Sequence, residues 1–279
     1  MVTIAKLRDK YHAAICAQLI HLKEGEKPSM ADVNSRLSVA ISRNLIKRIP
    51  HPIGVKSVKG QTAGSGLEQL TKSFLDDAFR LLQHLRPGQW SFSLHTSISN
   101  FDQYNHLSDL AEIIRKHPSI RTALGDYIIS PDIVVARYPV SDSEIDVKKI
   151  LAKGKSLPRF TPLRAANTTA PTLHASISCK WTIRSDRSQN ARTEGLNLIR
   201  NRKGHTPHIA VVTGEPMPTR IASVAIGTGD IDCVYHFALH ELIEAVSETK
   251  DEAAIDSLKI MIDGRRLRDI ADLPFDLAL

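Results

Sequence analysis

The sequence has little cysteine, and its cysteines form no recognisable metal or disulfide pattern. Three are present, Cys16, Cys179 and Cys233, an odd number without C-x-x-C spacing. This pattern excludes a disulfide framework and a zinc ribbon, and it favours a reducing environment. The chain also lacks the apolar run of a signal peptide, and no window approaches the roughly 18 apolar residues of a membrane span. We therefore expect a soluble cytoplasmic protein.

Several common catalytic motifs are missing as well. The segment from His236 to Glu241 does not supply the HExxH of a zinc protease, so its histidines are expected in the core or in an interface. The glycines at 64–66 form neither a complete GxGxxG nor a loop followed by GK[ST]. Ser178 and Cys179 have no base or oxyanion context. These absences argue against a zinc protease, a phosphate-loop enzyme and a Ser or Cys nucleophile.

Positive charge is present in modest excess and is unevenly distributed. The formal net charge is +7, which favours an anionic partner, although a soluble protein with a basic surface would show the same total. The clustering is more informative. The segment 180–203 carries seven Lys or Arg residues against two acids, Asp186 and Glu194.

The pattern of apolar residues changes along the chain. We expect one domain over residues 1–279, with a mainly helical part (1–120) and an α/β core (121–279). Helical periodicity is found at 4–19, 33–41, 64–85, 106–116, 142–153, 186–203 and 236–248. β-segments are expected at 126–136 (one interrupted segment or a hairpin), 173–182, 208–212 and 220–225, with a long loop at 153–169.

The segment 173–182 alternates strictly between an apolar and a polar face. Leu173, Ile177 and Trp181 lie on the apolar face, while Ser178 and Lys180 lie on the polar one. This alternation predicts a half-buried strand with a lysine pointing from a wall of small side chains. A helix with Ser185 or Asp186 as its N-cap is expected to follow.

A carboxylate near this lysine would make a metal-dependent nuclease. Asp132 follows Pro131 and opens an apolar run, so it is expected at a strand end, although a turn-capping aspartate would look the same. In such a centre the acid holds Mg²⁺, which neutralises phosphate and helps to generate hydroxide, while a lysine such as Lys180 stabilises the attacking water. One acid is rarely enough for a hard divalent cation.

The second acid is missing from its usual place. Two residues before the lysine of the Pro-Asp…(Asp/Glu)-x-Lys pattern stands Ser178, which cannot replace a carboxylate. Glu194 lies about two turns into the following helix, which could bring its carboxylate back to the vacant place. The alternative is a glutamate facing solvent.

The junction between this strand and helix carries Arg184, Asp186 and Arg187. Arginine can read guanine O6 and N7 together, and aspartate can accept from cytosine N4, so the set suits a G·C-rich major groove. A salt-bridged helix cap on a solvated face is the competing interpretation.

The segment 178–204, SCKWTIRSDRSQNARTEGLNLIRNRKG, resembles the catalytic and recognition segment of the NgoMIV-type restriction endonucleases. These form the CCGG-reading branch of the PD-(D/E)xK nucleases, and the resemblance is densest over 178–216. It implies a restriction-endonuclease-like core, a mixed central sheet flanked by helices with an added N-terminal helical layer. In the family the glutamate lies fourteen residues past the lysine, which supports a catalytic set of Asp132, Ser178, Lys180 and Glu194.

The resemblance also implies roles outside this set. Glu68 would lie near the metals, and the CCGG-reading residues would be Arg184, Asp186 and Arg187. The outer G·C pair would be contacted by Arg220 and, more loosely aligned, by Asp32, where Asn34 departs from the expected serine; Gln61 would reach the minor groove. The implied activity is Mg²⁺-dependent cleavage of double-stranded DNA at GCCGGC with 5′ overhangs by a homotetramer engaging two sites. A cognate DNA methyltransferase is expected in the host.

The residues alone are compatible with two other functions. A repair or recombination nuclease that reads DNA structure would have little use for the Arg-Ser-Asp-Arg cluster. A DNA-binding protein on a degenerate nuclease scaffold would not need the full set of Asp132, Lys180 and Glu194.

Overall fold

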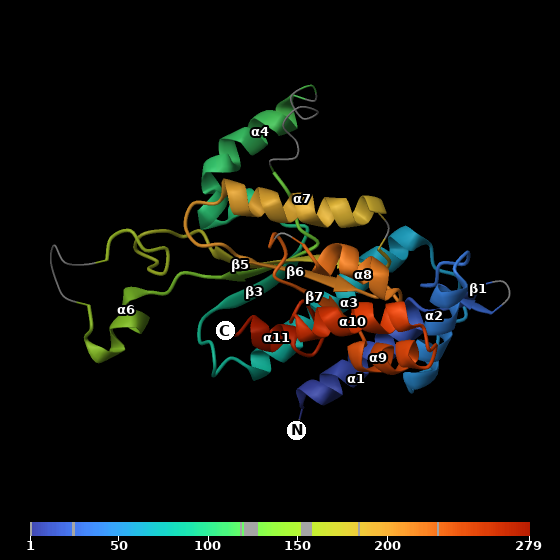
Figure 1. The fold of residues 1–279 in the computed structure, drawn as a ribbon. Coiled ribbons are helices and arrows are strands. Elements are labelled where there is room, and N and C mark those ends of the chain that lie inside the picture. The colour runs from blue at the N-terminus through green and yellow to red at the C-terminus, as the bar shows by residue number, and fades with distance from the viewer. Residues whose placement is uncertain are drawn as a thin grey trace.

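The computed structural model describes residues 2–23, 26–117, 119, 128–151, 158–183, 185–227 and 229–279, without the side chains of residues 111 and 185–188. A mixed β-sheet forms its centre (Figure 1). The sheet order is β3 (Trp90–Leu94), β4 (Ile133–Arg137), β5 (Thr172–Lys180), β6 (His208–Thr213), β7 (Cys233–His236) and β8 (Leu267–Asp269). The pairs β3–β4 and β4–β5 are antiparallel. The strands from β5 to β8 are parallel to each other. The predicted α/β class with a mixed sheet and flanking helices is confirmed.

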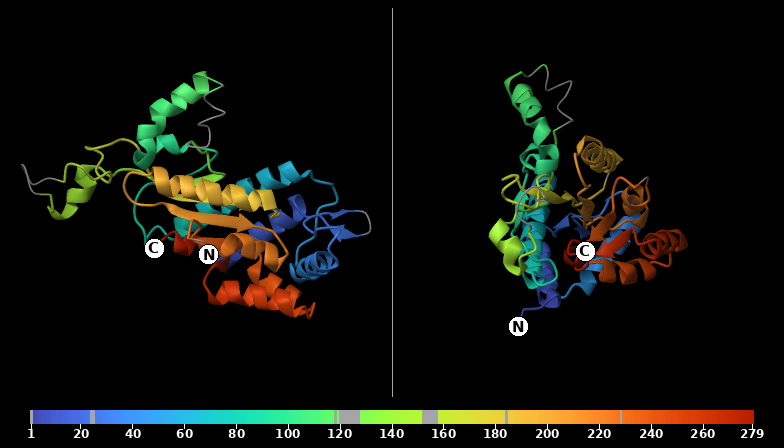
Figure 2. Two further views of the ribbon diagram at one scale, coloured as in Figure 1. Left: turned by 45° about the horizontal axis from the view of Figure 1, so that its top comes forward. Right: turned by 90° about the vertical axis from the view of Figure 1, so that its left-hand side faces the viewer.

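Helices cover both faces of this sheet (Figures 1 and 2). On one face, α3 (Gly60–Leu81) packs against β3 and β5, with α1 (Ile4–Gln18) beside it. On the other face lies α7 (Ser185–Asn201). The approach of α7 is close, because a Cβ added at Gly195 would lie 2.5 Å from the carbonyl oxygen of Asp230. The predicted N-terminal helical layer is therefore present.

Several of the remaining helices pack around strands β7 and β8. α2 (Arg36–Arg48) packs against α9 (Leu239–Ser247), and α10 (Glu252–Asp263) contacts α8 (Pro218–Ala225). The shorter elements are β1 (Leu22–Lys23), β2 (Lys27–Pro28), α4 (Ser108–Lys116), α6 (Asp142–Ile145), α11 (Leu273–Asp276), η1 (Ile98–Asn100), η2 (Asp102–Leu107) and η4 (Asp146–Lys148). Among the described residues, no helix is long and apolar enough to cross a bilayer.

Several predicted elements were wrong. The expected strand at 220–225 is helix α8, which starts at Pro218 and buries Ile221 and Val224 at helical spacing. The helix expected at 236–248 begins only at Leu239, because His236 ends strand β7. Residues 152–153 of the charged segment 142–153 lie outside the described residues, and its described part is helical over 142–148. Of the expected segment 126–136, residues 126–127 lie outside the described residues, and strand β4 begins at Ile133.

Strand β5 is buried on both faces, so the prediction of a half-buried strand was also wrong. Leu173 and Ile177 pack in the core on the side of α3, while His174, Ser176 and Ser178 are 5–7% exposed on the other side. Buried polar side chains need hydrogen-bond partners. His174 Nε2 pairs with the carbonyl oxygen of Leu277 at 2.7 Å. The polar face is thus an internal polar layer, and it leads to the candidate site.

Candidate active site

Asp132 and Lys180 meet at the ends of two neighbouring strands. The antiparallel register pairs Ile133 of β4 with Ile177 of β5, which brings the residue before β4 close to the last residue of β5. Asp132 Oδ2 accepts a hydrogen bond from Lys180 Nζ at 3.1 Å and another from the backbone N–H of Cys179 at 2.7 Å. The two side chains are 19% and 17% exposed, so the pair lies in a recess that still opens to solvent.

Ser178 and Glu194 complete this cluster from the strand and the helix above it. The Ser178 hydroxyl lies 3.4 Å from Asp132 Oδ2 and 3.3 Å from Glu194 Oε2. A serine hydroxyl has one proton to donate, so it serves one of the two carboxylates at a time. Glu194 therefore reaches the place beside Ser178 that the sequence pattern leaves without an acid.

The charges of this cluster influence each other. Burial raises the pKa of Glu194, and the nearby charge of Asp132 adds to this, while Lys180 and the Ser178 hydroxyl act against it. Burial lowers the pKa of Lys180, but the negative charges of Asp132 and Glu194 and the hydrogen bond to Asp132 outweigh that effect. The pKa of Lys180 is therefore raised, and its ammonium group stays protonated at neutral pH.

Glu68 approaches from α3 together with a residue that the sequence analysis missed. Glu68 is 8% exposed, and its Oε2 lies 3.0 Å from His95 Nε2. Burial and the charge of Asp132 raise the pKa of Glu68, while His95 and Lys180 lower it. His95 follows β3 with φ +51°, and its backbone N–H donates to the carbonyl oxygen of Asp132 at 3.3 Å. A single histidine after a short strand carries no sequence signal that it would contact Glu68 and the backbone of Asp132.

The donor atoms present fit a hard divalent cation. Asp132 and Glu194 offer carboxylate oxygens on either side of one hydroxyl, and Mg²⁺ commonly binds one or two carboxylates plus phosphate and water. Among the described residues, no group of three or more His, Cys, Asp or Glu side chains is arranged around a metal position. A pocket of about 540 Å³, lined by Ile129, Asn190 and Thr193 among others, opens on Glu194.

Much of the predicted CCGG-reading set lies outside the description. Arg184 falls outside the described residues, and so do the side chains of Asp186 and Arg187. The residues on either side of this set are described in the structure. Ile183 is buried just beyond β5, and α7 begins at Ser185, so the three residues follow Lys180 by four to seven positions in the sequence.

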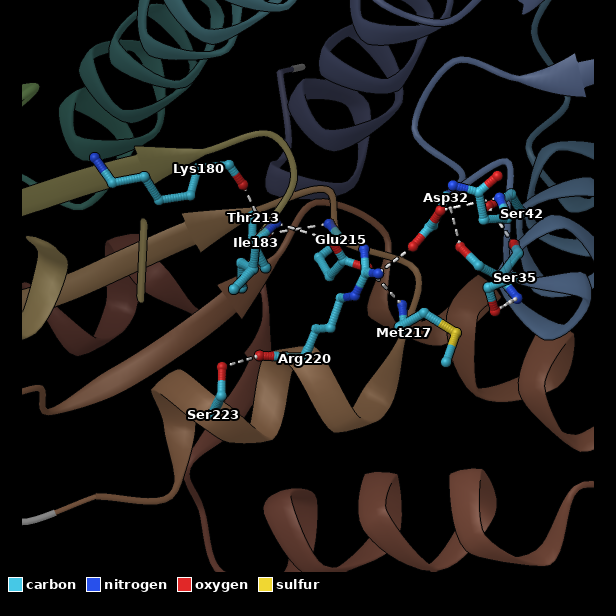
Figure 3. Close-up of polar contacts among 12 residues, drawn as sticks. Asp32, Ser35, Ser42, Lys180, Ile183, Thr213, Glu215, Met217, Arg220 and Ser223 are labelled. Atoms are coloured by element: carbon cyan, nitrogen blue, oxygen red, sulfur yellow. Dashed lines mark hydrogen bonds and ion pairs between the residues drawn. The ribbon is translucent and has the colours of Figure 1, made fainter. Parts of the chain in front are cut away.

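Arg220 and Asp32, the two residues expected at the outer base pair, form an ion pair (Figure 3). Arg220 lies in the first turn of α8, and Asp32 lies in the loop before α2, where its Oδ1 accepts from the backbone N–H of Asn34 at 3.0 Å. Both line a pocket of about 740 Å³, which Thr182 and Ile183 also line. Gln61 is exposed in the first turn of α3.

A second residue missed by the sequence analysis lies behind this ion pair. Glu215 is fully buried after β6, with its Oε1 4.0 Å from Arg220 Nη1. Its surroundings raise the pKa of Glu215 to about 7, chiefly through burial. An isolated glutamate in a Gly-Glu-Pro turn gives no sequence signal of such burial.

Comparisons with known proteins agree with this geometry. The family described as NgoMIV restriction enzyme matches residues 11–279. The chain is also similar to a protein from Neisseria gonorrhoeae called type II restriction enzyme NgoMIV, with 47% identity over 257 residues. The aligned part covers 90% of each chain. Both findings confirm the family resemblance drawn from residues 178–204.

Proposed function

The chain belongs to the NgoMIV restriction-enzyme family and is a type II restriction endonuclease, and from this premise we propose that it cleaves GCCGGC in a Mg²⁺-dependent reaction that leaves 5′ overhangs. Family membership establishes a site-specific deoxyribonuclease that binds double-stranded DNA. The sequence it reads, its metal and the role of each residue belong to the proposal.

One observation carries the chemistry. The Ser178 hydroxyl lies within 3.4 Å of carboxylate oxygens from both Asp132 and Glu194, and Lys180 Nζ lies 3.1 Å from the first of them. A carboxylate that the sequence places fourteen residues after the lysine is thus near the position where the nuclease pattern needs it. A glutamate facing solvent would not have this arrangement.

Each residue has a distinct task in the proposed reaction. Asp132 and Glu194 would hold the cation, and the Ser178 hydroxyl would donate its one proton to one of their oxygens at a time. When bound, Mg²⁺ neutralises phosphate charge and lowers the pKa of the attacking water. Lys180, kept protonated by its neighbours, donates a hydrogen bond to that water and stabilises it as it attacks phosphorus in line with the leaving oxygen. Glu68 assists near the metal, directly or through water.

Base reading is assigned to two groups of side chains. Arg184 and Arg187 contact guanines of CCGG and Asp186 accepts from cytosine, as the hydrogen-bonding capacities of these groups favour. Arg220 and Asp32 read the outer G·C pair in the same donor and acceptor manner. Their ion pair supports this assignment, because it places a donor and an acceptor side by side at one pocket. Gln61 contacts the minor groove.

The assembly proposed for this reaction is a homotetramer that engages two DNA sites at once. It rests on family membership, as does the expectation of a cognate methyltransferase that protects the host's own sites. Cleavage of a two-site plasmid faster than a one-site plasmid, together with a tetramer mass in solution, would be the expected observations.

The decisive experiment is a digest of one plasmid with two GCCGGC sites and several ACCGGT and TCCGGA sites, with and without Mg²⁺. Metal-dependent cuts only at GCCGGC are expected. A D132N preparation, purified in the same way, excludes contaminating nuclease. Cuts at every CCGG would preserve the roles of Asp132, Lys180 and Glu194 but remove Arg220 from base reading. No cut in either condition would refute the proposed reaction.

A further inference from the structure

Glu215 is a buried acid that neither the proposed chemistry nor the proposed base reading uses. It follows strand β6 and has no exposed surface. A buried carboxylate requires compensating hydrogen bonds or opposite charge. The partners of Glu215 therefore indicate what this residue holds in place.

Both oxygens of the Glu215 carboxylate are used by segments that approach the DNA-reading residues. Oε2 accepts from the backbone N–H of Ile183 at 2.8 Å, and Ile183 directly precedes Arg184. Oε1 accepts from the backbone N–H of Met217 at 3.1 Å, at the N-cap of the helix that carries Arg220. Figure 3 shows Glu215 between these two segments, with the Arg220 guanidinium beside it.

The same turn is also tied to the backbone of the catalytic lysine. The backbone N–H of Glu215 donates to Thr213 Oγ1 at 3.1 Å, and Thr213 Oγ1 donates to the carbonyl oxygen of Lys180 at 2.7 Å. The turn is tightly packed, since a Cβ added at Gly214 would lie 2.5 Å from the ring of Trp181. A continuous set of contacts thus joins Lys180, Glu215 and Arg220.

We propose that Glu215 is a positioning residue that fixes Arg220 relative to the catalytic strand and so makes cleavage depend on the outer base pair. This inference rests on the proposed role of Arg220. The carboxylates of Asp32 and Glu215 both attract the Arg220 guanidinium, but backbone hydrogen bonds hold them in place to different extents. Asp32 lies in the loop before α2 with its side chain 27% exposed, and the backbone N–H of Asn34 donates to its carboxylate, whereas Glu215 is buried and is anchored by two backbone N–H groups. If the Asp32 carboxylate accepts from a base, Glu215 still lies beside the Arg220 guanidinium and holds the N-cap of its helix, so Arg220 keeps its orientation.

A purely structural role for Glu215 makes a different prediction. A glutamate that only stabilised the turn would, when replaced, lower cleavage of every CCGG-containing site by the same factor. A residue that aims Arg220 changes the ratio between sites that differ only in the outer pair. The readout is therefore the ratio of kcat/KM for a GCCGGC duplex to that for an ACCGGT duplex, measured at pH 8 with Mg²⁺.

The test compares E215Q, R220A and the double variant with E244Q as a matched control. Gln keeps the volume of Glu215 but places an amide N–H₂ against a backbone N–H, so one of the two anchors is lost. We expect E215Q to lower the ratio about tenfold, a magnitude typical of a lost hydrogen bond to a charged group. The double variant should match R220A alone, since the two changes remove one function. E244Q, at a surface glutamate of α9, should leave the ratio unchanged.

The outcomes separate this inference from the proposed function. If R220A leaves the ratio unchanged, the assignment of Arg220 to the outer pair fails and this inference fails with it. If R220A lowers the ratio and E215Q does not, or if the two effects multiply, only the role of Glu215 is overturned. Should E215Q not fold, E215D replaces it, because it keeps the charge and withdraws the carboxylate by one methylene. A ratio equal to that of the unaltered protein in folded E215D would also overturn the proposal.

Discussion

The candidate catalytic cluster and the corner proposed to read the outer base pair are built in different ways. Ser178 and Lys180 lie on β5 and Asp132 directly precedes the adjacent β4, so the register of the sheet fixes their separation. Arg220 and Asp32 are 188 residues apart in sequence, and they meet only because a helix end and a loop lie side by side. The first arrangement follows from backbone hydrogen bonds, and the second depends on a few side-chain contacts. Single substitutions should therefore abolish chemistry at the first region and alter selectivity at the second.

The largest expected effect comes from K180M. It removes the ammonium group that we propose stabilises the attacking water, and it deprives Asp132 of the hydrogen bond from Lys180 Nζ at 3.1 Å. We expect single-turnover cleavage of GCCGGC to fall by about 10³-fold or more, while Ca²⁺-supported DNA binding in a gel-shift assay changes far less. K259M at an exposed lysine of α10 is the control. Cleavage by K180M within tenfold of the unaltered protein would contradict the assignment.

The second prediction tests whether the second carboxylate must come from helix α7 or can come from strand β5. E194Q should lower cleavage by about 10²- to 10³-fold, because it removes one of the two acids proposed for the metal. S178D/E194Q restores an acid at the place beside Asp132, two residues before Lys180. We expect it to recover part of the lost rate at GCCGGC, whereas S178D alone should not exceed the unaltered protein. Absence of any recovery in a folded double variant would show that the helix position itself is needed.

The third prediction uses pH to examine the buried acid of the reading corner. Glu215 has a pKa of about 7 instead of its ordinary 4.5. Between these values the folded protein binds more protons at Glu215 than the unfolded chain does, so stability is lost as pH rises. Over this window the free energy of unfolding should fall by about 2.5 kcal/mol relative to E215Q, in which the group does not titrate. The Glu215 carboxyl group is surrounded by Arg220, Asp32 and His236, which the unaltered protein and E215Q share.

Urea unfolding at pH 5 and pH 7.5, without metal, measures this difference. The sign is the informative part, because buried histidines such as His174, whose pKa is lowered to about 3, act in the opposite direction. Taking the difference from E215Q cancels their contribution. A constant stability difference between pH 5 and pH 7.5 would mean that Glu215 has an ordinary pKa.

The contrast between the two regions also explains what the sequence could and could not predict. The strand with Lys180 was found because period-two alternation is a strong local signal, and Glu194 because a helix fixes spacing. The segment 220–225 was misassigned, since a short apolar run fits a strand or a helix equally well. His95 and Glu215 were missed because their partners are distant in sequence. The alternation in 173–182 predicted a polar face open to solvent. In the structure that face is buried, because it lines the candidate site.

The smallest expected effect tests Glu194, which helix α7 and not the sheet brings to the candidate cluster. Glu194 reaches Ser178 because α7 lies close to the loop at Asp230, and that approach depends on Gly195. A Cβ at 195 would lie 2.5 Å from a backbone oxygen, so in G195A the helix must shift. We expect a loss of about 2 kcal/mol in unfolding free energy, comparable to overpacking a core, and a lower cleavage rate with unchanged preference between GCCGGC and ACCGGT.

G64A in α3 is the matched control, because a Cβ there meets nothing within 4 Å. It should stabilise the protein by about 0.5–1 kcal/mol, the usual gain of Ala over Gly inside a helix. If G195A instead lowered the preference for the outer pair, the placement of α7 and that of Arg220 would be coupled. Arg192 offers a route for such coupling, since its guanidinium on α7 donates to the carbonyl oxygen of Ser223 in α8 at 2.8 Å. An unchanged preference would show that the placement of α7 does not affect that of Arg220, which is tied to the catalytic strand through Glu215 instead.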